Sequence, residues 1–153
     1  MSNKRPKLPL SQEEKQKLRY HKIKISDFNK LGLTNIIDIL EVSEERSKIL
    51  KGLADFQVVP SIGIKLAEKL VFKLELYSLD DIKSKDGAEL LDQLEEKLGV
   101  WTDPCVEDQI RCVIYYANTF RVDKQWFDFT EERKRYRETY GYPGSRPKMA
   151  WYE

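Results

Sequence analysis

A short turn between two helix-forming stretches constrains this chain more than any other feature. The turn covers residues 59–63 (VPSIG), and amphipathic stretches at 43–56 and 64–74 flank it. Pro60 fixes φ and cannot continue a helix. Gly63 can adopt backbone conformations that other residues avoid, and it lets another surface approach closely. The pattern therefore predicts two helices joined by a tight hairpin.

Apolar residues recur at helical spacing through the rest of the chain, and capping residues such as Ser11, Ser43 and Asp86 precede several of these segments. We expect helices at 11–20, 26–31, 35–40, 43–56, 64–74, 78–82, 86–98, 104–119 and 131–140. The sequence thus predicts an all-α fold, a compact helical domain with no sheet.

The chain has 153 residues, of which 41% are hydrophobic and 35% are charged. This length and composition fit one globular domain. We expect a flexible arm at 1–10, a single helical domain at 11–140 with the hairpin at about 44–75, and a C-terminal tail at 141–153. No apolar run is long enough to span a membrane, and the N-terminus lacks the apolar core of a signal peptide. We therefore expect a cytoplasmic protein with no membrane partner.

Charge is distributed unevenly, although the net charge is only +1. Basic residues dominate 4–24, acidic residues dominate 80–108, and basic residues return at 133–148. This asymmetry is compatible with a polyanionic partner. It is equally compatible with ordinary solvated faces, so both interpretations stay open.

The sequence argues against a metal centre or an active site. Cys105 and Cys112 lie seven residues apart in one expected helix, and His21 is the lone histidine. This spacing does not fit a zinc site, so we expect two reduced, buried thiols, no metal and no cofactor. No set of nucleophile and base appears either, and we do not expect an enzyme. The aromatic residues within 126–129 are expected to close the core.

The segment 59–67 follows the pattern apolar-Pro-x-apolar-Gly-x-x-x-Ala, which resembles the helix-hairpin-helix motif. That resemblance implies binding to a nucleic-acid backbone without reading of the base sequence. One phosphate would face backbone N–H groups, the Ser61 hydroxyl would donate to it, and a lysine stripe would follow the strand. The candidate site residues are Ser61, Ile62, Gly63, Ile64, Lys65, Lys69 and Lys73. Ser61 stands where the motif usually has glycine, so a hairpin that only joins two helices remains an alternative.

Four segments together resemble a larger family, the bacterial pathogenicity-locus helix-hairpin-helix proteins. They are 59–63, 78–82 (SLDDI), 103–111 (DPCVEDQIR) and 126–129 (WFDF). The resemblance covers roughly 44–133 and implies an all-α protein with DNA binding and no established enzymatic activity. Two functions follow as expectations. The first is sequence-nonspecific binding of DNA or another nucleic acid, and the alternative is a non-catalytic protein-interaction or structural module.

Overall fold

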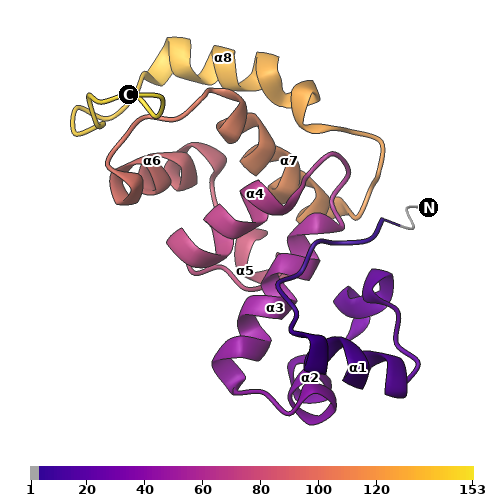
Figure 1. Ribbon diagram of the computed structural model, residues 1–153. Coiled ribbons are helices and arrows are strands. Elements are labelled where there is room, and N and C mark those ends of the chain that lie inside the picture. The colour runs from indigo at the N-terminus through magenta and orange to yellow at the C-terminus, as the bar shows by residue number, and fades with distance from the viewer. Residues whose placement is uncertain (1–3) are drawn as a thin grey trace.

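The computed structural model describes residues 4–153, and the regular structure of this part is helical, apart from one isolated bridge between Trp101 and Ala150 (Figure 1). The predicted all-α class is confirmed. None of the helices described is both long and apolar enough to cross a membrane. The elements are α1 (Gln12–Tyr20), η1 (Ile25–Lys30), α2 (Leu33–Leu40), α3 (Glu44–Gln57), α4 (Ile64–Glu68), η2 (Lys69–Lys73), α5 (Leu79–Ile82), α6 (Gly87–Leu98), α7 (Cys105–Thr119), η3 (Trp126–Phe129) and α8 (Thr130–Tyr140).

Local capping explains where most of these helices begin. Ser11 and Glu14 form a reciprocal capping box at α1, in which each side chain accepts from the other residue's backbone N–H. Asp86 accepts from the first turn of α6 in the same way, and Gly99 ends that helix in the left-handed region. The expected helix at 35–40 instead begins at Leu33, after Gly32.

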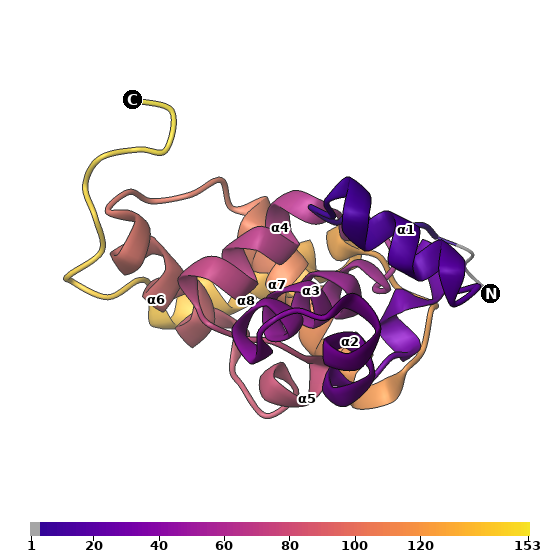
Figure 2. The ribbon, with the colours of Figure 1, turned by 60° about the horizontal axis from the view of Figure 1, so that its bottom comes forward.

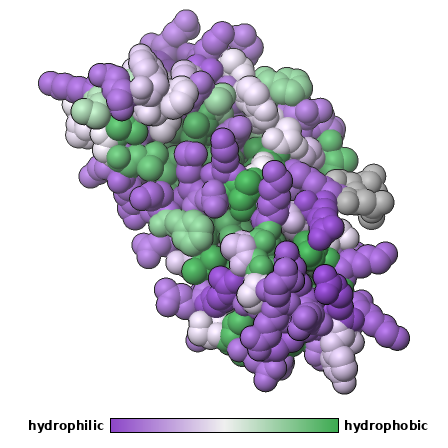
Figure 3. Space-filling view, in the orientation of Figure 1, coloured by the Kyte–Doolittle hydropathy of each residue, from purple (hydrophilic) through white to green (hydrophobic). Residues whose placement is uncertain are grey.

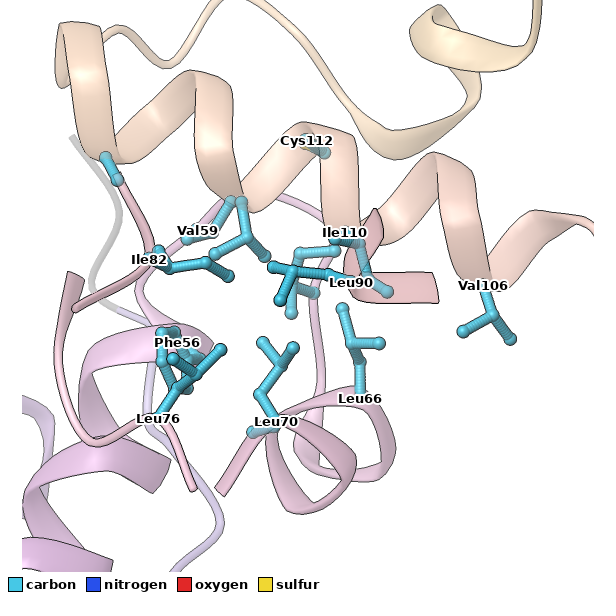
Figure 4. Close-up of a cluster of buried hydrophobic side chains, with 14 of the residues drawn as sticks. Phe56, Val59, Leu66, Leu70, Leu76, Ile82, Leu90, Val106, Ile110 and Cys112 are labelled. Carbon is cyan, nitrogen blue, oxygen red and sulfur yellow. The ribbon is translucent and has the colours of Figure 1, made fainter. Parts of the chain in front are cut away.

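Helix α3 lies at the centre because it contributes to two cores. One face joins the cluster formed with α4, η2, α6 and α7, which Figure 4 shows around Phe56, Leu70 and Ile110. The other face carries Leu50 and Ala54 into a smaller cluster with α1, η1 and α2. Figure 1 accordingly shows α1 and α2 on one side of α3 and α6, α7 and α8 on the other.

Gly52 allows α3 to pack closely against the segment that follows α4. A Cβ at this position would lie 2.9 Å from Cγ2 of Val71 and 3.0 Å from Cα of Tyr77. Both distances are shorter than an ordinary carbon contact. The sequence alone did not indicate this close approach at Gly52.

Helix α8 has no buried residue and is attached by ion pairs to α7. Glu107 and Asp108 of α7 are buried. Nε of Arg133 lies 2.9 Å from Oδ1 of Asp108, and Nε of Arg137 lies 2.9 Å from Oε1 of Glu107. Two consecutive carboxylates thus hold two arginines that are four residues apart on α8.

The C-terminal segment is docked in a similar way. Arg146 pairs with the buried Glu95 of α6 at 2.7 Å and lies over the ring of Tyr142. Arg137 also pairs with Asp92 of α6. Four carboxylates of the acidic stretch at 80–108 therefore pair with three arginines of the basic stretch at 133–148. Hydrophilic side chains cover most of the face in Figure 3, with apolar side chains between them.

The expected aromatic core at 126–129 is correct only in part. Phe129 is 5% exposed and belongs to the main core, and Trp126 is half-buried against that core. Phe127 is 53% exposed, so its assignment to the core is wrong. The short helical turn η3 explains the difference, because neighbouring residues in such a turn point in different directions.

Candidate nucleic-acid interface

The unusual backbone conformation of the hairpin is not at Gly63, where the sequence led us to expect it. Gly63 has φ −113° and ψ −170°, which is extended backbone open to any residue. A Cβ on Gly63 would meet nothing within 4 Å. Ser61, in contrast, has φ +67°, in the left-handed region. The unusual conformation of the turn therefore falls on Ser61, and the fold itself does not require glycine at 63.

Two of the predicted phosphate donors are already used inside the protein. The Ser61 hydroxyl donates to the carbonyl oxygen of Pro60 and accepts from the backbone N–H of Trp126 at 2.9 Å. Ile62 is buried, and its N–H donates to the carbonyl oxygen of Val59 at 3.2 Å. Before the Ser61 hydroxyl could donate to a phosphate, its hydrogen bond to the carbonyl oxygen of Pro60 would have to break.

The other predicted residues lie together, with one exception. Gly63, Ile64, Lys65 and Lys69 all line one surface groove of about 520 Å³. Lys73 is exposed but is not among the lining residues. Between 69 and 73 the helix widens to π geometry, with the N–H of Leu74 donating to the carbonyl oxygen of Lys69. This local change of helical pitch interrupts the predicted lysine stripe.

The opposite wall of this groove comes from the predicted arm. Residues 1–3 lie outside the described part, but from Lys4 onward the segment runs along α3 (Figure 1). The buried side chain of Gln57 bonds the Lys7 backbone twice, accepting from its N–H at 2.9 Å and donating to its carbonyl oxygen at 2.8 Å. An extended peptide is thereby fixed beside the hairpin.

Lys4 joins the arm to the turn itself. Its ammonium donates to the carbonyl oxygen of Val59 at 3.1 Å and to that of Ile62. Burial lowers the pKa of Lys4, and the nearby Cys112 opposes this shift. A basic residue near the N-terminus is too common a feature for this contact to be expected from sequence alone.

The groove is strongly cationic. Its charged lining consists of Lys4, Arg5, Lys7, Lys65 and Lys69, and the remaining polar side chains are Gln57 and Gln109. Among residues 4–153, no carboxylate lines it. A surface of this kind attracts polyanions and has no acidic group to repel them.

The two thiols lie apart from this cationic chemistry. Cys112 is buried and Cys105 is half-buried, and both are free. Burial raises the pKa of each thiol to about 11. Within residues 4–153, no group of three or more His, Cys, Asp or Glu side chains could hold a metal ion.

Comparison with known proteins identifies the central part of the chain. No curated protein and no solved structure matches it. The protein family Cdd1, described as pathogenicity locus, matches residues 49–135. The matched region begins within α3 and ends within α8, so it contains the hairpin, the main core and the ion pair of Asp108 with Arg133. The chain therefore belongs to the pathogenicity locus family.

Proposed function

We propose that this protein binds the sugar-phosphate backbone of DNA or another nucleic acid, without base specificity, in the groove between the N-terminal arm and α4. One observation carries the proposal: of the residues that the structure describes, five cationic side chains and no carboxylate line that groove. In this proposal α3, the turn at 58–63 and α4 act as a helix-hairpin-helix. The protein would act in the cytoplasm and would not be an enzyme.

The hairpin residues supply a second line of support. Gly63 is exposed, and no neighbouring atom would meet a side chain there. A bare backbone at this point allows a phosphate to approach the N–H groups of Gly63, Ile64 and Lys65. Lys65 and Lys69 then lie within the same groove to neutralise neighbouring phosphates. Such contacts position a strand and carry no base information.

Charge reversal in the groove tests the proposal directly. The variant K65E/K69E should lose most of its affinity for labelled oligonucleotides in fluorescence anisotropy at low salt. The control K134E/R135E makes the same change in net charge on exposed residues of α8 and should bind as the wild type does. Wild-type affinity should vary little with base sequence and should fall linearly with salt on logarithmic axes. Unchanged binding by K65E/K69E would mean that the hairpin only joins two helices and does not bind nucleic acid.

A non-catalytic protein-interaction module is the second candidate, and one observation favours it. Three apolar side chains are exposed on the connection from α7 to α8: Phe120 at 67%, Val122 at 62% and Phe127 at 53%. Exposed apolar clusters often mark protein contacts. If this candidate is correct, the variant F120S/V122S should abolish co-purification of a partner while leaving DNA affinity unchanged.

A further inference from the structure

A second cationic groove adjoins the first. It has a volume of about 420 Å³ and lies between the arm, α1 and the start of η1. Its charged lining consists of Arg5, Lys15, Arg19 and Lys24, and the rest is Leu18, Ile23, Ile25 and Ser26. As in the first groove, the described part of the chain contributes no carboxylate.

Arg5 lines both grooves, so the two adjoin at the arm. The arm is fixed at this point from two sides. Gln57 holds the Lys7 backbone on one side of Arg5, and on the other side the Lys4 ammonium donates to the carbonyl oxygen of Val59 at 3.1 Å. Figure 2 shows α1 and α4 along the same edge of the molecule. The shared arginine thus lies on a rigid bridge between the two cationic surfaces.

Helix α1 separates its charges between two faces. Lys15 and Arg19 are four residues apart and share the groove face. The acidic residues are engaged elsewhere. Glu14 is buried and pairs with Arg46 at 2.9 Å, while Glu13 lies 3.5 Å from Lys17. The carboxylates of α1 therefore do not neutralise the second groove.

We propose, building on the function proposed above, that the two grooves form one track for a single nucleic-acid strand or duplex edge. The backbone would run from the hairpin groove past Arg5 and along Lys15, Arg19 and Lys24. The track would offer five cationic residues in the first groove and three more in the second. The second half lies before residue 49, outside the region that the family matches.

Two consequences distinguish a track from a single site. An oligonucleotide that fills only the hairpin groove should not respond to changes in the second groove, whereas a long one should. Each phosphate contact that is lost should also lower the slope of log affinity against log salt by about 0.7 for a single strand and 0.9 for a duplex. Removal of three contacts should therefore lower the slope by about 2–3.

The experiment uses the full chain and neutral substitutions of similar size. The variant K15Q/R19Q/K24Q is compared with the wild type, and K134Q/R135Q/K148Q is the control because it removes the same charge from exposed residues elsewhere. Circular dichroism checks that each variant is folded. Binding is measured with oligonucleotides of about 6 and about 20 nucleotides over a range of salt concentrations. We expect K15Q/R19Q/K24Q to bind the short one normally and to lose at least tenfold affinity for the long one, with the lower slope.

Each alternative result has a separate meaning. If K15Q/R19Q/K24Q binds the long oligonucleotide as the wild type does, while K65E/K69E fails to bind, the track is refuted and the proposed function stands. If K65E/K69E binds both oligonucleotides normally, the proposed function fails and the track fails with it. If poly-glutamate of matched charge competes as well as DNA, the surface is a general polyanion site and the nucleic-acid track is refuted.

Discussion

The hydroxyl oxygen of Ser61 accepts a hydrogen bond from the backbone N–H of Trp126, 65 residues further along the chain, at 2.9 Å. This bond ties the hairpin turn to the segment after α7. It also compensates for the left-handed conformation of Ser61, which glycine would adopt without strain.

Substitutions at Ser61 should separate these two effects. Ser61→Ala loses the bond and keeps the strain, so it should lower the free energy of unfolding by about 0.5–1.5 kcal/mol. Ser61→Gly loses the same bond and relieves the strain. It should therefore be more stable than the alanine variant by about 1 kcal/mol. Urea denaturation of both variants measures the difference, and equal stabilities would show that the left-handed backbone stores no strain.

Two glycines should respond in opposite ways to an added side chain. Gly52→Ala should cost about 1–3 kcal/mol of stability, because its Cβ would collide with Val71 and with the backbone of Tyr77. Gly63→Ser should leave stability unchanged or raise it by a few tenths of a kcal/mol, because serine is a good N-cap and the site is open. If a phosphate approaches the turn, Gly63→Ser should nevertheless weaken DNA binding. Thermal denaturation and anisotropy measure the two properties separately.

The buried ion pair between α7 and α8 predicts a large effect on stability. Arg133→Met leaves the carboxylate of Asp108 buried without its arginine, although Thr130 still donates to it at 2.9 Å. The cost should be about 3–5 kcal/mol. The double variant D108N/R133M should recover part of this loss, because the amide carries no charge. The neighbouring exposed substitution Lys134→Met is the control and should change stability by less than about 0.5 kcal/mol. If Arg133→Met and Lys134→Met lost similar amounts of stability, the ion pair would have no specific role.

Phe127 and Phe129 provide a matched pair of aromatic truncations. Phe129→Ala should cost about 3–5 kcal/mol because its ring is buried in the main core. Phe127→Ala should cost less than about 1 kcal/mol because half of its side chain already contacts water. Equilibrium unfolding in urea measures both values. A large loss at Phe127 would mean that its ring is buried in solution.

The thiols should react slowly in the folded protein. Burial raises the pKa of Cys105 and Cys112 to about 11, so only a small fraction of each is thiolate at about pH 8. Alkylation by iodoacetamide should be at least about tenfold slower than in the urea-unfolded chain, where the pKa is near 8.5. Mass spectrometry of timed samples follows the reaction. Rapid modification of either thiol in the folded state would show that it is an accessible thiolate.

Local sequence was sufficient to predict most of the helices and many of their ends. Ser11, Asp86 and Gly99 act within one turn of their own helix, so the physical cause lies in neighbouring residues. The helical spacing of apolar residues likewise marks the buried face of the helices in the core. These features required no knowledge of distant contacts, and the all-α fold followed from them.

The tertiary structure decided which charges and donors remain available to a ligand. Arg133 and Lys65 are both basic residues of predicted helices. In the structure Arg133 pairs with a buried carboxylate, whereas Lys65 lines an open groove. The Ser61 hydroxyl already donates to the carbonyl oxygen of Pro60, and the arm became a wall of the groove because Gln57 holds Lys7. The electrostatic and hydrogen-bonding state of a side chain depends on its partners in space. Most of those partners lie tens of residues away, and only the folded chain brings them together.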